Sequence, residues 1–419
     1  MQSSMTSYQA GRASKVGLFD RRSPVIDIVF TATLFLALAL NLIIGPLTPL
    51  TIIGIIPVYM LLRWERLPGI FASSWPLFLL PLLAIVSAFW SEAPERSVRY
   101  GILYLITVTP AIFIGAGVER DSLLKGIFIA FAIYIVLSLL FGRWVGWGVG
   151  GRAFAGLMGS KNAAGDIAAL TLITSTMMIF YAWGRRQWVW FAIALLIIPI
   201  GLYSLWASKA TGALVATIIA LPCLLAGCFC RRLSPAVRNM IFILIFLFTV
   251  TALVTLPIWI DTIFESVLDA TGKDAGITGR DILWKKADEL IIDKPWVGQG
   301  YSSFWVRNNL EAEYLWRAMG VQSRTGFNFH NTPREILVHL GFLGLTLYFF
   351  IALFAAIRLI VKTVKSLEYA SIFCFSLFIF ELPRLMFEVI GFTNMHFATV
   401  IVFIVMAYGL GPKKLRKIG

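Results

Sequence analysis

Apolar residues occur along the chain in long continuous runs separated by short polar segments. The runs cover residues 25–44, 47–63, 72–90, 100–118, 123–141, 162–182, 188–207, 211–230, 239–258, 333–357, 367–386 and 394–411. An α-helix needs about 20 apolar residues to cross the hydrocarbon core of a bilayer. The short alternating segments that are typical of membrane barrels do not occur, and no internal repeat is apparent. The pattern predicts an all-α polytopic membrane protein with about 12 transmembrane helices.

The composition agrees with lipid as the main solvent of this chain. Hydrophobic residues make up 59% of it and charged residues only 14%, whereas a soluble domain is about half apolar and a quarter charged. The formal net charge of +14 raises the question of nucleic-acid binding. However, the basic residues are scattered between the apolar runs, where they set membrane topology. We therefore expect no nucleic-acid partner.

The polar segments define the predicted organisation. A cytoplasmic tail of residues 1–24 precedes a single transmembrane domain of residues 25–411, and a basic cytoplasmic tail of residues 412–419 follows it. Residues 259–332, between the ninth and tenth runs, are predicted to form a large inserted periplasmic loop. Placing both termini in the cytoplasm puts most Lys and Arg of the tails and short loops on the cytoplasmic side. The first run is longer than a signal-peptide core, so we expect it to remain as an uncleaved span.

The long polar segment contains signals of local structure. Its apolar residues Leu283, Ala287, Leu290 and Ile291 follow the spacing of an amphipathic helix. Residues 293–295 (Asp-Lys-Pro) are expected to end that helix, and two glycines mark a turn after it. Aromatic residues then follow, as expected for a loop packed against the membrane interface. The glycines are Gly298 and Gly300, and the aromatic residues are Tyr301, Phe304, Trp305, Tyr314 and Trp316.

Several basic residues fall on predicted outer loops, against the topological trend. Arg152 and Lys161 lie in a Gly-rich loop before the sixth run, and Lys209 lies in a tight connection after the seventh. Arg280 begins the amphipathic helix of the long loop. If these side chains converge, they form a cationic pocket that suits an anionic phosphate head group. The alternative is that each one separately extends to lipid phosphates.

The sharpest local feature is the segment Phe-His-Asn-Thr-Pro-Arg-Glu of residues 329–335. Thr332 and Glu335 have the spacing of a capping box, and Pro333 fits the first helical position, so the tenth span is expected to begin here. His330 then lies just before the positive end of a helix, which attracts anions and favours neutral imidazole. Such a His can accept a proton from an attacking hydroxyl. The alternative is a His that only hydrogen-bonds the loop to the helix.

Three ionisable residues lie in and just after the eleventh run. Glu381, Arg384 and Glu388 would share one face if the helix continued. They are predicted either to form internal ion pairs or to contact the substrate. Asp166, one turn into the sixth run, is expected to orient Lys161 or Arg152. The other spans are almost free of charge, which counts against an ion-coupled transporter.

Other chemistries have little support in the residues. No Asp-x-Asp pair for a divalent metal and a nucleotide sugar occurs on a predicted outer loop, and the sequence has no P-loop or Gly-x-Ser-x-Gly motif. The cysteines Cys223, Cys228, Cys230 and Cys374 lie in apolar runs and fit small apolar filler better than disulfides or a zinc site. We therefore expect neither a metal nor a cofactor.

A series of short motifs occurs in a fixed order between about residue 90 and residue 345. The motifs are Trp-Ser-Glu-Ala-Pro at 90–94, Gly-Leu-Met-Gly-Ser-Lys-Asn-Ala-Ala-Gly at 156–165, Ser-Lys-Ala-Thr at 208–211, Gly-Arg-Asp-Ile-Leu-Trp at 279–284, Pro-Trp-Val-Gly-Gln-Gly-Tyr at 295–301, His-Asn at 330–331 and Gly-Phe-Leu-Gly at 341–344. In these motifs the chain resembles the O-antigen ligase and polymerase superfamily of bacterial envelope proteins, most closely its exopolysaccharide-polymerisation branch. Two positions depart from that pattern: Lys209 stands where many relatives have Arg, and Ser160 stands where exopolysaccharide relatives often have His.

The resemblance implies a metal-independent inverting glycosyltransferase of the bacterial inner membrane, active at its periplasmic face. The implied donor is a glycan linked to undecaprenyl diphosphate, and the acceptor is a glycan or a lipid-linked glycan. His330 matches the position of the family's catalytic base. Residues expected to bind the diphosphate or the glycan are Arg152, Lys161, Asn162, Lys209, Arg280, Asn331, Arg334 and Arg384. Membrane lipids and chain-length and export proteins are the further partners implied.

Alternatives remain open at this point. A polymerase would join lipid-linked repeat units into exopolysaccharide or O-antigen, whereas a ligase would transfer the glycan to lipid A core. A small-solute transporter and a non-catalytic scaffold of an export complex are readings of other classes. Polar groups at the outer face favour an enzyme, and polar groups at the bilayer midplane favour a transporter.

Overall fold

The computed structural model describes residues 23–147, 150–240, 280–324 and 327–412. Eight helices or helical runs in this part of the chain are long and apolar enough to cross a membrane. They are Trp64–Phe89, which joins η1 (Trp64–Arg66), α4 (Leu67–Ser74), η2 (Trp75–Phe78), α5 (Leu79–Val86) and η3 (Ser87–Phe89); α6 (Pro94–Gly117); α7 (Arg120–Phe141); α8 (Lys161–Gly184); α9 (Trp188–Ser208); α10 (Thr211–Cys230); α14 (Thr332–Ser366); and Tyr369–Met386, which joins α15 (Tyr369–Glu381) and η4 (Pro383–Met386).

Shorter apolar helices complete the bundle. They are α1 (Pro24–Ala39), α3 (Leu47–Leu62), which follows the single turn α2 (Asn41–Ile44), and α16 (Phe397–Leu410). Together the long and short helices match every predicted run except residues 239–258, which lie almost entirely outside the described residues. The all-α polytopic fold class is therefore confirmed, whereas the total number of spans stays a prediction.

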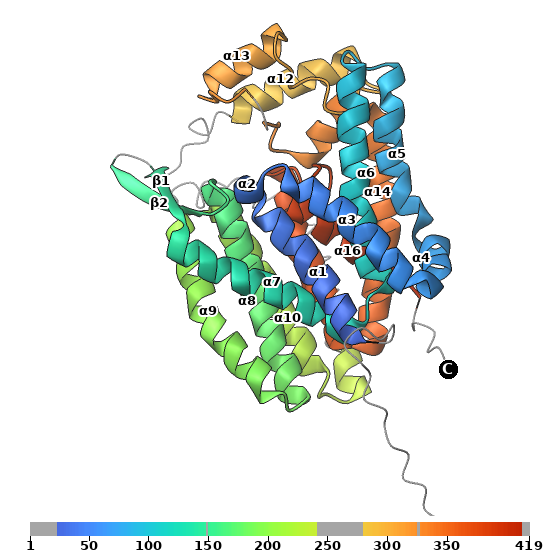
Figure 1. Ribbon diagram of the computed structural model, residues 1–419, viewed down its shortest axis with the longest axis vertical. Helices are drawn as coiled ribbons and strands as arrows, with labels where there is room; N and C mark the ends of the chain where they lie inside the picture. The colour runs from blue at the N-terminus through green and yellow to red at the C-terminus, as the bar shows by residue number, and fades with distance from the viewer. Residues whose placement is uncertain (1–22, 148–149, 241–279, 325–326, 413–419) are drawn as a thin grey trace, which may run out of the picture.

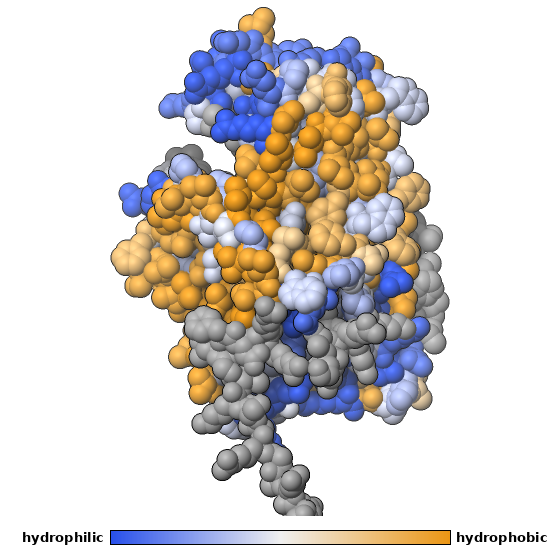
Figure 2. Space-filling view, turned by 45° about the vertical axis from the view of Figure 1, so that its right-hand side comes forward, coloured by the Kyte–Doolittle hydropathy of each residue, from blue (hydrophilic) through white to orange (hydrophobic). Residues whose placement is uncertain are grey.

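Large apolar side chains are exposed on the surface of the bundle, as expected for a surface in contact with lipid. Phe89 is 90% exposed, and Leu61 and Leu196 are 73% and 69% exposed. Figure 2 shows a broad hydrophobic band across the middle of the visible face, with hydrophilic residues gathered above and below it. A soluble protein rarely leaves so large an apolar area in water. The chain is a multi-pass membrane protein.

Small residues let the central helices approach closely. A Cβ added to Gly115 of α6 would lie 2.3 Å from the carbonyl oxygen of Ile404 in α16, so these two helices pack backbone to backbone. This contact places the end of α16 beside the end of α6. Glu119, just after α6, donates its backbone N–H to Asp27 near the start of α1. Both described ends of the chain therefore lie at the same end of the bundle, which we call the chain-end side.

The opposite end of the bundle carries two further helices, α12 (Arg280–Asp293) and α13 (Leu310–Ala318), and we call it the cap side (Figure 1). The start of α6 lies here, because Ser97 donates to the carbonyl oxygen of Tyr301 and Arg96 to that of Ser302. The phenol of Tyr301 also donates to the carbonyl oxygen of Phe392. The described part of the predicted inserted loop is thus attached to the membrane helices by hydrogen bonds.

The predicted amphipathic helix of the loop is confirmed as α12. Leu283, Ala287 and Leu290 are buried, and they pack in a small separate core with aromatic residues of the segment that follows. These are Phe304, Trp305, Trp316 and Phe329. The expectation that the loop aromatics pack against the membrane interface is therefore wrong for most of them, because their rings fill the core of the cap itself.

The start of α14 corrects the predicted capping box. Asn331, rather than Thr332, is the N-cap, and its side chain accepts from the backbone N–H of Arg334 at 2.9 Å. The Thr332 hydroxyl instead donates to the carbonyl oxygen of Glu388 at 2.8 Å. The Glu335 carboxylate accepts from the backbone N–H of Phe329 at 2.8 Å. The bond from Thr332 reaches a residue 56 positions away, so the local motif did not show that Thr332 is engaged there and that Asn331 takes the N-cap position.

Gly341 interrupts α14 two turns later. Its φ is +61°, and an added Cβ would lie 2.3 Å from the backbone of Trp296. The interruption lets Phe342 donate its backbone N–H to the carbonyl oxygen of Pro295. A glycine is required because only glycine adopts this φ easily and leaves room for the second backbone. The kink thus connects α14 to the turn that follows α12.

The Gly-rich segment before α8 is a β-hairpin, which the sequence reading did not predict. Strand β1 (Arg143–Trp147) pairs antiparallel with β2 (Gly151–Gly156), and Gly146 lies opposite Arg152. Figure 1 shows the hairpin projecting beyond the ends of α8 and α9. Most of the predicted tails, and residues 259–279 of the predicted loop, lie outside the described residues.

Candidate functional site

Glu388 lies at the centre of a cluster of polar side chains on the cap side. One carboxylate oxygen, Oε1, accepts from Arg280 Nη2 at 3.2 Å and from Asn162 Nδ2 at 3.3 Å. The other, Oε2, lies 3.2 Å from His330 Nδ1. The side chains of Glu388, His330 and Arg280 are each about a quarter exposed. We call these four residues the Glu388 cluster.

The cluster forms beside the N-termini of α8 and α14. Asn162 is in the first turn of α8, His330 lies one residue before the N-cap of α14, and Arg280 is the first described residue of α12. Each helix N-terminus carries partial positive charge and backbone N–H groups without helical partners. The described N-termini of α8 and α14 and the Arg280 guanidinium give this part of the cap side a strong attraction for anions.

The backbone around His330 is held firmly. Phe329 donates its N–H to Glu335, and its carbonyl oxygen accepts from Trp284 Nε1 at 3.0 Å. The N–H of His330 itself donates to the side chain of Asn328 at 2.8 Å. His330 has a φ of +48°, a left-handed conformation that is unfavourable for a residue with a Cβ. Such strain persists only where surrounding contacts impose it, and it is often found at functional sites.

The electrostatics of Glu388 keep it ionised. Burial alone would raise the pKa of its carboxyl group. The hydrogen bond from His330 and the positive charges of Arg280 and Arg384 outweigh that effect and hold the pKa below its usual value. An ionised Glu388 accepts a hydrogen bond from the Nδ1–H of His330, which leaves Nε2 with its lone pair. The ring of His330 packs edge-on against Phe327.

Beneath this cluster, toward the membrane, lies a second group of charges. Arg384 in η4 is 3% exposed and is paired with Glu381 at 2.5 Å and with Asp166 of α8. The structure thus favours the internal ion pairs among the two alternatives predicted for Glu381 and Arg384. It also corrects the expectation for Asp166, which pairs with Arg384 rather than with Lys161 or Arg152. The helix ends at Glu381, so Glu388 turns away to its own partners.

The remaining predicted cations are arranged around the cluster in different ways. Lys161 precedes Asn162, donates to the carbonyl oxygen of Lys209 at 3.4 Å and lies over the Trp147 ring. Lys209 is exposed, with its ammonium 4.1 Å from the ring centre of Trp206. Arg152 is exposed on β2. Within the described ranges, neither Lys209 nor Arg152 forms an ion pair with an acidic side chain.

Asn331 and Arg334 are occupied by contacts within the protein. The amide of Asn331 caps α14 and donates to the carbonyl oxygen of Met386 at 3.1 Å. Arg334 forms a bidentate pair with Asp288 of α12, with nitrogen–oxygen distances of 2.8 and 3.1 Å. These contacts join α14 to η4 and to α12. Both residues therefore position the helices that carry His330 and Arg280.

The sequence of the chain is similar to known proteins of one family. Residues 199–349 match the family model described as O-Antigen ligase, and this range includes Lys209, Arg280 and His330. The chain is also 31% identical over 319 residues to the exopolysaccharide production protein ExoQ of Rhizobium meliloti (strain 1021). That similarity covers 74% of this chain and 72% of the relative.

Proposed function

The chain belongs to the O-antigen ligase family, and from that premise we propose that it polymerises lipid-linked oligosaccharide repeat units into exopolysaccharide or O-antigen. Membership supports a role in the polymerisation or ligation of such polysaccharides. The observation that carries the finer proposal is the meeting of His330 and Arg280 at one carboxylate, Glu388, beside the N-termini of α8 and α14.

The donor in this proposal is a glycan on undecaprenyl diphosphate. Arg280 uses Nη2 for Glu388, and the described structure contains no other partner for its guanidinium, which leaves N–H donors for a phosphate oxygen. The helix N-termini and Lys209 add positive charge. In transfer, the bond between the anomeric carbon and the diphosphate oxygen breaks, and the leaving oxygen takes the electron pair. Fixed cations stabilise that charge, as a metal would in other transferases.

His330 is the proposed general base. The acceptor hydroxyl oxygen attacks the anomeric carbon from the face opposite the diphosphate, so the configuration inverts. Nε2 of His330 takes the hydroxyl proton as the new bond forms. Glu388 accepts a hydrogen bond from the Nδ1–H of His330, with the two heavy atoms 3.2 Å apart. Its negative charge stabilises the imidazolium that results. Glu388 is thus a positioning residue that acts through His330.

The other predicted binding residues have graded roles in this proposal. Lys161 and Lys209 lie next to each other and near Asn162, so they are placed to contact the second phosphate or the first sugar. Arg152, on the exposed hairpin, meets the donor further from the reacting bond. Arg384 stays beneath the site in its ion pairs with Asp166 and Glu381.

The proposed orientation puts the cap side in the periplasm and the chain-end side in the cytoplasm of a bacterial inner membrane. Arg185 and Arg186 follow α8, Arg231 and Arg232 follow α10, and Lys365 lies in the last turn of α14, all on the chain-end side. Excess Lys and Arg mark the cytoplasmic side of membrane proteins. Membrane lipids are then direct partners, and chain-length and export proteins are proposed partners on the periplasmic side.

A ligase that transfers the glycan to lipid A core is the second candidate, because the matched family model bears that description. The two activities share the donor and differ in the acceptor. The geometry of His330 and Glu388 suits either acceptor. The name of the ExoQ relative refers to exopolysaccharide production, which is why we favour the polymerase.

The test is reconstitution of the purified protein with an undecaprenyl-diphosphate-linked repeat unit, without added metal, followed by sizing of the products. A polymerase gives a ladder of multiples, whereas a ligase gives one addition only when lipid A core is supplied. His330→Ala should lower the initial rate by about 10²–10⁴-fold, which is the usual contribution of a general base. Its melting temperature should stay close to that of the wild type. Absence of product with either acceptor would contradict the proposed function and favour a transporter.

A further inference from the structure

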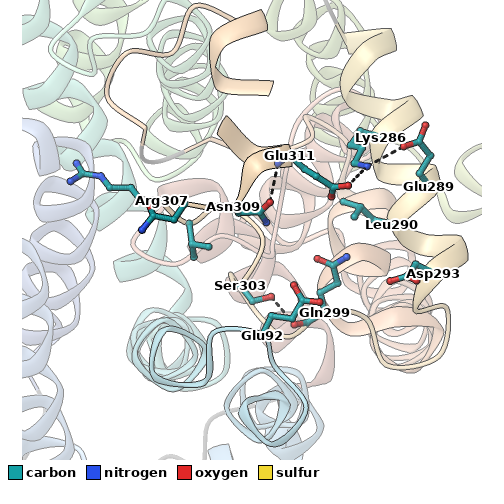
Figure 3. Close-up of a pocket in the computed structure, with 12 residues that line it drawn as sticks. Glu92, Lys286, Glu289, Leu290, Asp293, Gln299, Ser303, Arg307, Asn309 and Glu311 are labelled. Carbon is teal, nitrogen blue, oxygen red and sulfur yellow. Dashed lines mark hydrogen bonds and ion pairs between the residues drawn. The ribbon is translucent and has the colours of Figure 1, made fainter. Parts of the chain in front are cut away.

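A second polar cavity lies on the cap side, on the flank of α12 that faces away from the Glu388 cluster. Its volume is about 580 Å³, within the range of about 300–1,000 Å³ that is typical of ligand sites. Lys286, Glu289 and Asp293 of α12 line one wall, and Glu92, which precedes α6, lines another (Figure 3). By contrast, Arg280 and Asp288 of the same helix pair with Glu388 and Arg334.

The chemistry of the lining narrows the class of ligand. Of its twelve residues only Leu290 and Val306 are apolar, which argues against a lipid chain. The lining holds four carboxylates and two cations, Lys286 and Arg307, and Lys286 is paired with Glu289 at 3.1 Å and with Glu311 at 2.5 Å. This balance disfavours a phosphate or a uronic acid. Among the described residues there is also no group of His, Cys, Asp and Glu suited to a metal ion.

Gln299 provides an independent sign of a ligand. It is 4% exposed, and its Oε1 has no hydrogen-bond partner among the residues that the structure describes. Its backbone is fixed, because its N–H donates to the carbonyl oxygen of Val338 at 2.8 Å and its carbonyl oxygen accepts from Ser303 Oγ at 2.7 Å. Figure 3 shows the side chain extended into the space between Ser303 and Leu290. A buried acceptor without a partner is unfavourable, and a ligand hydroxyl would satisfy it.

We propose that this cavity is a carbohydrate-binding subsite that holds a neutral, hydroxyl-rich segment of the glycan away from the reacting sugar. The juxtaposition of the unpartnered Gln299 Oε1 with carboxylates and the Lys286 ammonium suits ligand hydroxyls, which both donate and accept. This inference rests on the proposed function. The helical rise places Lys286 about 9 Å and Asp293 about 20 Å along the axis from Arg280. A glycan therefore occupies the subsite only with a part several bonds removed from its reacting end.

The consequence for the reaction is retention of the growing chain. A glycan held at the cavity remains near His330 after each transfer, so the next transfer meets a high local concentration of acceptor. Loss of the subsite should shorten the products without slowing the first transfer. A single-addition ligase would gain nothing from such a subsite.

The experiment measures binding separately from catalysis. The full chain carrying His330→Ala, in lipid nanodiscs, is titrated with delipidated oligomers of the producing cell's own repeat unit, one, two and four repeats long. Gln299→Leu in this background should weaken binding of the longer oligomers about tenfold, as loss of a buried hydrogen-bonding group does. The matched control Gln322→Leu changes an exposed glutamine outside the cavity and should leave binding unchanged.

A second variant guards against a folding defect. The side chain of Glu289 is 54% exposed, so Glu289→Ala should fold normally and also weaken oligomer binding. Absence of oligomer binding in the parent protein, or unchanged binding in both variants, would overturn the subsite. In otherwise wild-type protein, Gln299→Leu should give shorter products at an unchanged rate of first addition. Failure of the proposed function would instead appear as no product from the wild type, whatever the oligomer binding.

Discussion

Asp27 and Glu388 are two carboxylates at opposite ends of the bundle, and each contacts several nitrogen atoms of other residues. Asp27, near the start of α1, accepts from Arg63 Nε and Arg66 Nη1 at 2.8 Å each and from the backbone N–H of Glu119 at 3.2 Å. Its side chain is 0% exposed, and that of Arg63 is 1% exposed. Glu388 has partners of similar chemistry at 3.2–3.3 Å. However, the side chains of Glu388, Arg280 and His330 are each about a quarter exposed.

The difference separates a structural ion pair from a candidate reaction centre. Arg63 also donates to the carbonyl oxygen of Ser23, and Arg66 to that of Gly117, so the Asp27 group joins α1 to the segments around α3 and α6. The two arginines of this group thus donate to Asp27 and to backbone oxygens of the protein. In the Glu388 cluster, His330 Nε2 and the rest of the Arg280 guanidinium have no hydrogen-bond partner in the described part of the chain, so under the proposed function they are available to a ligand. A buried ion pair whose hydrogen-bond donors are all used within the protein therefore indicates a role in stability. A partly exposed cluster with unused hydrogen-bonding groups indicates a role in binding or chemistry.

The largest effect on stability should follow from Asp27→Asn. The substitution leaves two arginines without their common carboxylate, one of them fully buried, and breaking a buried ion pair costs about 3–5 kcal/mol. We expect a marked fall in melting temperature and in the yield of folded protein. The matched control is Asp121→Asn on the same side of the bundle, where the pair with Arg185 spans 3.7 Å and both side chains are about half exposed. Equal losses in the two variants would contradict the comparison.

Glu388→Gln should lower activity strongly and stability only slightly. It removes the charge that orients and stabilises His330. In metal sites, loss of the carboxylate partner of a His costs about 10–100-fold in activity, and we expect a loss of similar size here. The melting temperature should fall by less than about 4 °C, the shift that a loss of about 1 kcal/mol produces. Polymerisation rate and thermal unfolding, measured on the same preparation, test this prediction.

Glu313→Gln is the control for that variant. Glu313 of α13 pairs with Arg324 at 3.3 Å, and neither residue contacts the Glu388 cluster. This control should retain the rate of the wild type. A large stability loss without a rate loss in Glu388→Gln would make the Glu388 cluster structural, like that of Asp27.

A smaller effect is expected from pH. Because the pKa of Glu388 is lowered in the folded protein, its ionised form is favoured by folding. Its contribution to stability is therefore fully present above the unfolded pKa of about 4.3 and is lost as the pH falls through the lower folded pKa. The difference in melting temperature between wild type and Glu388→Gln should be constant near pH 6 and should narrow below pH 4. A difference that widens on acidification would reverse the assigned sign.

Sequence patterns predicted the helices well because membrane spans are determined locally, by apolar length. The amphipathic helix α12 and its end before Pro295 were also predictable, since periodicity and a helix breaker lie within one segment. The β1–β2 hairpin was missed because glycines mask the alternation of a strand. The kink at Gly341 was missed because it depends on Trp296, which is distant in sequence.

The candidate site shows the same limit. His330, Arg280 and Asn162 were named from their motifs, but their common partner Glu388 comes from a segment after the eleventh span. Continuing the helix beyond Glu381 placed Glu388 on the face of Arg384, and the 3₁₀ turn of η4 removes that relation. The N-cap of α14 was assigned to Thr332 rather than to Asn331 for a similar reason, because the Thr332 hydroxyl bonds to the backbone of residues 388 and 390. Local patterns identify which residues carry chemistry, whereas the fold decides which of them meet.

The most direct test of the account is a double-mutant cycle between His330 and Glu388 in the reconstituted polymerisation assay. Initial rates are measured for the wild type, His330→Ala, Glu388→Gln and the double variant. If Glu388 acts through His330, the double variant should be no slower than His330→Ala alone, because the carboxylate has no remaining group to position. If Glu388→Gln lowers the rate by the same factor in both backgrounds, the two residues act independently and the proposed pair is contradicted.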